Sequence, residues 1–135
     1  MSKEMREKID RFKNWKQFLN ENIYGDIWYH ITPDVNLPSI RISGIKMSND
    51  GTNGIGVYLS DSIKEALKWK DILEYENYEE NNARGVKEWF IIEIHNLNKK
   101  KLDKEDVFED DELYFTEYVY RDNIGLDKIK SIKKI

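Results

Sequence analysis

The chain has 135 residues, the size of one domain with its own hydrophobic core. Hydrophobic residues make up 39% of it and aromatic residues 13%, which excludes disorder for most of the chain, and no stretch is apolar enough for a membrane helix. The absence of Cys excludes disulfides and thiolate metal sites, and the net charge of -4 argues against broad binding to phosphate backbones. We therefore expect one soluble, cytoplasmic domain that binds no metal.

The start of the chain predicts a helix followed by a strand. Large apolar residues recur every three or four positions from Lys3 to Asn20, which predicts an amphipathic helix within residues 1–25. We expect it to pack on the domain core, with binding of a partner as the alternative. A short β-rich run from Ile27 to Ile31 predicts a strand with Trp28 and His30 on one face.

A short helix and a loop come next. Asn36 and Gly44 are expected to bound a helix over Leu37 to Ser43, because Asn caps helix starts and Gly ends helices. Met47 to Gly56 has a loop composition. Its glycines lack the Lys-Ser/Thr of a phosphate-binding loop and lead into a strand, so we expect a flexible loop there.

A second strand and a helix are expected after this loop. The strand runs from Ile55 to Leu59, with its aliphatic residues on one face and Tyr58 on the other, beside small glycines. Ser60 or Asp61 is expected to cap a helix that ends at about Leu73. The residues expected on the inner side of this helix are Ile63, Ala66, Leu67 and Lys70.

The second half of the chain is expected to be mainly β. Glu74 to Arg84 is acidic and Asn-rich and indicates a solvated connection. Trp89 to Ile94 predicts a third strand with Glu93 and His95 facing away from its apolar side. A polar link anchored by Leu102 is expected over Lys99 to Asp106, and an acidic loop over Glu109 to Glu112.

Two strands are expected at the C-terminal end. One runs from Leu113 to Tyr120, where Glu117 falls on the same face as the apolar residues Leu113, Phe115 and Val119. A carboxylate in such a row is unusual, because burying a charge is unfavourable unless it is partnered or lines a cleft. The other strand ends the segment from Ile124 to Ile135. Together the elements predict a single α+β domain over residues 26–135.

Three strand residues remain as candidates for chemistry: His30, Tyr58 and Glu117. Taken singly, each residue has a purely structural explanation. His30 would be a hydrogen-bonded strand residue, Tyr58 a core aromatic residue and Glu117 a carboxylate on an edge strand. The two His are far apart and lack the local spacing of a zinc motif, and Ser60 is not in a nucleophile elbow. Metal binding and triad hydrolysis are therefore not expected.

Four short motifs carry a resemblance to a known family. They are Ile27-Trp-Tyr-His-Ile-Thr32, Ser39-Ile-Arg-Ile-Ser-Gly-Ile45, Gly54-Ile-Gly-Val-Tyr-Leu-Ser60 followed by a helix with Ala66, and Glu117-Tyr-Val-Tyr120. In this order, from about Ile27 to Ile132, the chain resembles the ADP-ribosyltransferases of the poly(ADP-ribose) polymerase-like, or diphtheria-toxin-like, class. The resemblance implies an ADP-ribosyltransferase-like split β-sheet with flanking helices.

The resemblance also implies residue roles. His30 would hydrogen-bond the nicotinamide-side ribose of NAD, the backbone of Ile31 would hold the carboxamide, and Tyr58 would stack on the nicotinamide ring. Glu117 would bond the ribose 2′-hydroxyl. The residues implied to bind NAD, as co-substrate, are His30, Ile31, Thr32, Tyr58, Ser60 and Ser62, and the implied catalytic residues are Glu117, His30 and Tyr58.

The chemistry of NAD cleavage agrees with these roles. Breaking the nicotinamide–ribose bond builds positive charge on the anomeric carbon and the ring oxygen, which a nearby carboxylate stabilises. One carboxylate suffices, because nicotinamide leaves as a neutral molecule and needs no general acid. A stacking surface and a positioned His would orient the sugar for attack from the opposite face.

These inferences predict a mono-ADP-ribosyltransferase that modifies a macromolecule, with a protein as the expected acceptor. Phe115 stands where relatives that modify arginine carry Gln or Glu, so an arginine acceptor is less expected. The small size fits a toxin or a phage factor that acts on host machinery inside a bacterial cell.

Three alternatives stay open. The segment Tyr29 to Ile40 also resembles ADP-ribosyltransferase toxins that modify DNA, so a nucleic-acid acceptor remains. An RNA 2′-phosphotransferase would need several Arg to hold its phosphorylated RNA, and the arginines here are scattered. The last alternative is a non-catalytic module of the same fold that binds a nucleotide or a partner protein.

Overall fold

The computed structural model describes residues 27–49 and 54–135. The helix expected from Lys3 to Asn20, and with it the proposed N-terminal unit at residues 1–25, lies outside the described residues. Part of the Gly-rich loop, residues 50–53, lies outside them as well.

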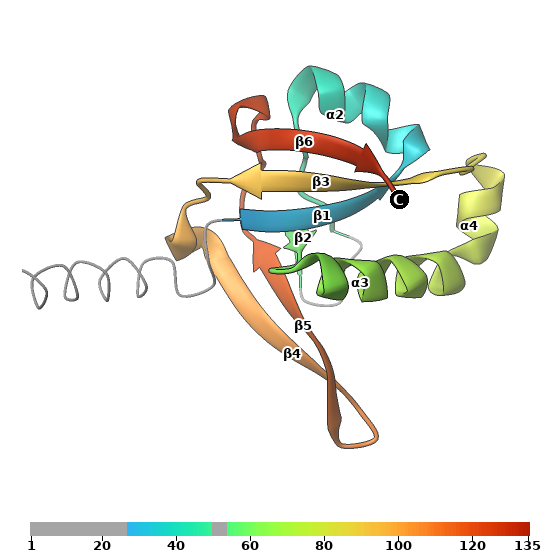
Figure 1. Cartoon of the computed structure of the whole chain (residues 1–135), viewed down its shortest axis with the longest axis vertical. Coiled ribbons are helices and arrows are strands. Elements are labelled where there is room, and N and C mark those ends of the chain that lie inside the picture. The colour runs from blue at the N-terminus through green and yellow to red at the C-terminus, as the bar shows by residue number, and fades with distance from the viewer. Residues whose placement is uncertain (1–26, 50–53) are drawn as a thin grey trace, which may run out of the picture.

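Strands in the described part of the chain form two three-stranded antiparallel sheets (Figure 1). The first sheet has the order β1-β3-β6 and the second the order β2-β5-β4. The strands are β1 (Ile27–Pro33), β2 (Val57–Leu59), β3 (Trp89–His95), β4 (Leu102–Glu109), β5 (Glu112–Tyr120) and β6 (Ile129–Lys134). With helices added at the sides, the expected α+β class is confirmed.

Helices flank these sheets (Figure 1). The α-helices are α2 (Leu37–Ser43), α3 (Ile63–Glu76) and α4 (Tyr78–Ala83), and the short 3-10 turns are η1 (Asp34–Asn36), η2 (Lys99–Lys101) and η3 (Leu126–Lys128). Helix α3 packs on β1 and buries Ala66 in a small apolar cluster with residues of β1 and β3. One face of the first sheet is therefore covered by α3.

The main core lies between the opposite face of the first sheet and the second sheet. It contains Trp28, Ile40, Ile45, Val57, Leu59, Ile92, Ile94, Leu97, Leu102, Tyr118, Tyr120 and Ile124. Its centre is an edge-to-face aromatic pair, Trp28 and Tyr118, with ring centroids 4.9 Å apart. The two sheets are thus held together by alternate residues of each strand.

The two sheets join at one point and then diverge. Tyr29 and Ser60 exchange both backbone hydrogen bonds, at 2.9 and 2.8 Å, as an isolated antiparallel bridge. Because the bridge is antiparallel, β1 beyond Tyr29 runs alongside β2 read back from Leu59 to Val57, but no further residue pair joins these strands within the described residues. The diverging strands leave a split beside β1 that positions the candidate site.

The alternation predicted for the strands is confirmed where the structure describes it. Trp28 and Ile92 lie in the core, while Glu93 and His95 lie on the other face of β3. In β2, Val57 and Leu59 enter the core and Tyr58 faces away from it. The side chains of Leu113 and Phe115 in β5 lie outside the described residues.

The helix over Leu37–Ser43 is confirmed, and it ends at Gly44, whose positive φ of 77° suits glycine. Asn36 stands at the N-cap, but its side chain caps no backbone group. It donates instead to Thr32 Oγ1 at 3.2 Å. The predicted position was therefore right and the predicted capping contact wrong.

The prediction for the start and inner face of the next helix was wrong. Ser62, not Ser60 or Asp61, caps α3, because its Oγ accepts from the backbone N–H of Glu65 at 3.1 Å. Ile63 and Leu67, expected on the inner side of α3, are exposed, as is Ile55, which lies outside β2. The side of α3 that packs inward carries Ala66, Trp69 and Leu73.

Two segments that were predicted to be irregular connections form helices and a strand instead. Glu74 to Arg84 completes α3 and contains all of α4, and Lys99 to Asp106 forms η2 and most of β4. The strongly polar β4 carries no apolar alternation and is a strand because every residue of it pairs with β5. Leu102 is buried at its start, as expected of an anchor.

Candidate functional site

A cavity of about 490 Å³ opens where the two sheets diverge. Residues of β1, α2, β2, α3 and α4 line it, together with the segments that connect them. Four of the residues expected to bind NAD are among them: His30, Ile31, Thr32 and Tyr58. The strand pairing therefore brings these residues together around one cavity.

His30 is fixed by the neighbouring strand. Its Nδ1 lies 2.8 Å from the backbone carbonyl oxygen of Tyr58. Because a carbonyl can only accept, Nδ1 carries the proton and donates, which leaves Nε2 of the neutral ring as an acceptor. Burial lowers the pKa of His30, opposed in part by this hydrogen bond. The ring is therefore neutral near pH 7 and can accept a hydrogen bond from a ligand hydroxyl.

Tyr58 presents its ring to α3. Its hydroxyl donates to the carbonyl of Gly54 at 2.8 Å, which fixes the ring plane. The indole of Trp69 lies nearly parallel to it, with ring centroids 6.4 Å apart and an interplanar angle of 12°. Contact between stacked carbon atoms is optimal at about 3.5 Å, so a flat ring between these two would need them about 7 Å apart. The planes of Tyr58 and Trp69 would have to stand that far apart to form such a slot.

The sequence interpretation missed Trp69. Its only signal was helical spacing, since Trp69 lies three positions after Ala66 and four before Leu73. The predicted inner face of this helix was displaced around its axis, which placed the indole outside the site.

The backbone of Ile31 points into the split. In an antiparallel ladder, successive residues direct their N–H and C=O groups to opposite sides of the strand. Tyr29 directs both groups to Ser60, which directly follows β2, so Ile31 directs both of its groups to the same side, where β2 diverges from β1. Within the described residues neither group has a hydrogen-bond partner. This leaves one donor and one acceptor beside each other at the cavity, because Ile31 also lines it.

Glu117 lies on the same face of the second sheet as Tyr58, but not on the cavity wall. Tyr58 pairs with Val119, so Glu117 projects from the same face of β5 two residues earlier. It is only 4% exposed, and its Oε1 is buried without a hydrogen-bond partner among the described residues. Burial, followed by the charge of Glu105, raises the pKa of Glu117 to about 7. It is not among the residues that line the cavity.

The two candidate serines serve the fold. Ser60 is buried and bridges the sheets through its backbone, and Ser62 caps α3 with its hydroxyl oxygen. Neither lines the cavity. The structure therefore does not bring them to the wall that His30 and Tyr58 form.

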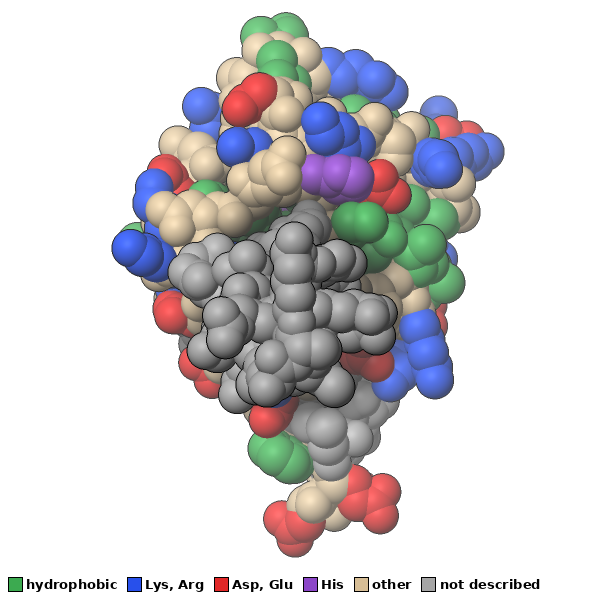
Figure 2. All heavy atoms as spheres, turned by 60° about the vertical axis from the view of Figure 1, so that its left-hand side comes forward, with side chains coloured by type: hydrophobic (Ala, Val, Ile, Leu, Met, Phe, Trp, Pro, Cys, Tyr) green, Lys and Arg blue, Asp and Glu red, His purple; other side chains and the backbone are tan. Residues whose placement is uncertain are grey.

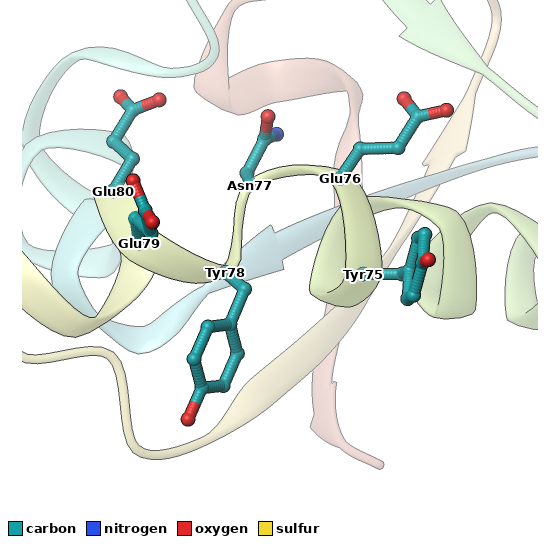
Figure 3. Close-up of a pocket in the computed structure, with 6 residues that line it drawn as sticks. All are labelled: Tyr75, Glu76, Asn77, Tyr78, Glu79 and Glu80. Atoms are coloured by element: carbon teal, nitrogen blue, oxygen red, sulfur yellow. The ribbon is translucent and has the colours of Figure 1, made fainter.

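The outer rim of the cavity is polar. Arg84 of the α4 C-cap donates to Asn36 Oδ1 across this rim. Figure 3 shows Glu76, Asn77 and Glu80 extending to one side of the turn between α3 and α4, and these three residues also line the cavity. The exposed tyrosines at positions 75 and 78 extend to the opposite side of that turn.

His95 lies away from this cavity. Its Nε2 is 2.8 Å from Glu93 Oε2 on the other face of β3. In residues 27–49 and 54–135, no cluster of His, Asp and Glu is arranged to hold a metal ion. None of the helices in those ranges is both long enough and apolar enough to cross a membrane.

Comparison with models of known protein families finds no match for this chain, and comparison with curated proteins finds none either.

Proposed function

We propose that the protein is a mono-ADP-ribosyltransferase that cleaves NAD and transfers ADP-ribose to a macromolecule, most simply a protein. The observation that carries this proposal is the unpartnered backbone N–H and C=O of Ile31 in the split between the sheets. A primary carboxamide has one acceptor oxygen and a donor NH₂ group, so it complements this pair. The paired rings of Tyr58 and Trp69 supply a place for the flat ring that carries the carboxamide.

The other residues would act on the ribose. Nε2 of His30 accepts a hydrogen bond from a ribose hydroxyl and orients the sugar. The carboxylate of Glu117 bonds the 2′-hydroxyl and stabilises the positive charge that develops as the nicotinamide–ribose bond breaks. The electron pair of that bond leaves with nicotinamide, and the acceptor attacks the anomeric carbon from the opposite face.

The arrangement of the sheets supports the finer fold assignment. An ADP-ribosyltransferase-like fold has a split sheet, and here two antiparallel sheets meet at the single bridge between Tyr29 and Ser60. Of the candidate catalytic residues, His30 of β1 and Tyr58 of β2 line the cavity at this split, and Glu117 lies on β5, the partner strand of β2.

A non-catalytic nucleotide-binding module is the second candidate function. It is favoured by one observation: Glu117 is buried and does not line the cavity. Such a module would bind NAD and release no nicotinamide.

The test is incubation of the protein with NAD labelled on the adenylate portion and a bacterial lysate, with Glu117→Gln alongside. A protease-sensitive labelled product that only the wild type makes is the expected result. A nuclease-sensitive product would instead support a nucleic-acid acceptor. Absence of both label transfer and nicotinamide release, with NAD still bound, would overturn the proposal in favour of the binding module.

A further inference from the structure

Two carboxylates lie opposite each other on neighbouring strands. Glu105 of β4 is the direct antiparallel partner of Glu117 of β5. Direct partners project from the same face with Cβ atoms about 5 Å apart, and like charges in this position destabilise a sheet. The fold therefore keeps a pair that is unfavourable for stability.

No cation within the described residues offsets this pair. Arg121, which directly follows β5, donates through Nε to Asp103 at 2.7 Å and through a terminal nitrogen to the carbonyl of Ile55 at 2.9 Å. Glu105 forms no ion pair within residues 27–49 and 54–135.

The two carboxylates have different environments. Glu117 is buried, with one oxygen unpartnered, whereas Glu105 is exposed. The pKa of Glu117 is raised by burial first and by the charge of Glu105 second. Neighbouring carboxylates in such different environments can serve as the two acid–base groups of one reaction.

Glu105 lies on the edge strand of a hairpin that projects from the rest of the molecule. Figure 1 shows β4 and β5 projecting as a hairpin away from the rest of the molecule, with β4 at the edge of its sheet. Figure 2 shows acidic side chains at the tip of this hairpin. The exposed residues of the tip are Asp110, Asp111 and Glu112. Such a surface repels acidic acceptor groups.

We propose that Glu105 is the general base that activates the acceptor, and that the acceptor is a protein side chain with an O–H or N–H group. This inference rests on the proposed function. As the bond between nicotinamide and the anomeric carbon breaks, its electron pair leaves with nicotinamide. The acceptor oxygen or nitrogen forms a bond to that carbon, and its proton passes to the Glu105 carboxylate.

This assignment separates the two halves of the reaction. Glu117 stabilises the charge formed when NAD is cleaved, whereas Glu105 acts only on the attacking group. It also excludes Asp and Glu side chains as acceptors, because a carboxylate attacks without a base and the acidic hairpin repels it. The product linkage is therefore expected to resist neutral hydroxylamine, which cleaves esters.

The test compares Glu105→Gln with wild type for two products, free nicotinamide and labelled acceptor. The matched control is Asp106→Asn, the same charge change one position along, where the side chain accepts from Thr116 Oγ1 on the other face of the hairpin. In Glu105→Gln, the fraction of cleaved NAD that ends on the acceptor is expected to fall about 100-fold, the lower end of general-base effects. Water takes the place of the acceptor, and the control keeps the wild-type fraction.

Three outcomes would overturn the assignment. An unchanged fraction in Glu105→Gln would remove Glu105 from acceptor activation, and so would an equal loss of nicotinamide and labelled acceptor. Release of the label by hydroxylamine would identify a carboxylate acceptor. Failure of the proposed function looks different, because wild type itself would then release no nicotinamide.

Discussion

Ile31 contributes to the site through its backbone. Its side chain packs with Ala66, Trp89 and Ile91, while its N–H and C=O face the split. Such groups are costly to leave unpaired when a ligand displaces water from them. A ligand that pairs with both is favoured over a close analogue that pairs with only one.

Nicotinamide and nicotinic acid differ in this respect. The carboxylate of nicotinic acid donates no hydrogen bond and would face the carbonyl oxygen of Ile31. We expect nicotinamide to inhibit NAD cleavage with a constant at least about 10-fold lower than that of nicotinic acid, because an unpaired buried polar group costs about 1–3 kcal/mol. Inhibition titrations measure both constants, and equal values would contradict the role of Ile31.

Glu117 shows how a buried charge affects stability. Its pKa is about 7 in the folded protein, against an ordinary value of 4.5. Between these values the folded state binds more protons than the unfolded state, so stability falls as the pH rises from about 4.5 to about 7. Above about pH 7 the fall in stability that is due to Glu117 is complete.

Glu117→Gln removes this pH-dependent loss, because Gln does not ionise. We expect the variant to be more stable than wild type at pH 8 by about 1 to 2 kcal/mol, with a much smaller difference at pH 5. Denaturant unfolding at the two pH values measures this. A variant that is less stable than wild type at pH 8 would show that the carboxylate stabilises the fold.

Helix α3 supplies one wall of the ring slot. Trp69 lies on its inward side and stacks with Tyr58. Because an aromatic pair contributes about 0.5–1.5 kcal/mol beyond buried area, Trp69→Ala should weaken NAD binding about 2- to 12-fold. Calorimetry in the Glu117→Gln background measures this without turnover. Leu67→Ala, on the exposed side of α3, is the control, and equal effects of the two changes would contradict the slot.

The pairing of β2 with β5 depends on a glycine. A Cβ atom at Gly56 would lie 2.4 Å from Val119 Cγ1 and 2.8 Å from the carbonyl oxygen of Tyr120. Gly56→Ala should therefore destabilise the fold by about 1–3 kcal/mol, as overpacking does. Gly125→Ala is the control, because its Cβ would meet only the end of the flexible Asp127 side chain. Equal unfolding free energies for the two variants would contradict this tight approach.

At the scale of the whole molecule, local patterns predicted the α+β class and two of the site positions. The alternation of side chains along the strands predicted the faces on which His30 and Tyr58 lie. The position of a carboxylate among apolar residues singled out Glu117. These signals are carried by neighbouring residues, so they can be read along the chain.

The features that were missed depend on contacts between distant segments. β4 is polar, and it forms a strand because it pairs with β5. The side of α3 that packs inward differs from the predicted side, and Trp69 therefore lies in the site, against Tyr58. The backbone groups of Ile31 are unpartnered within the described residues because β2 diverges from β1 beyond the bridge between Tyr29 and Ser60. The position of Glu117 opposite Glu105 likewise required the register of the hairpin.

The most direct test of the account is the rate of nicotinamide release from NAD, measured from pH 5.5 to 8.5 for wild type and Glu117→Gln. Because the ionised carboxylate stabilises the developing positive charge, the wild-type rate should rise with pH through about 7. The variant should be slower by about 100-fold or more at pH 8 and lack this rise. Equal rates in the two proteins would contradict the site, whatever the acceptor is.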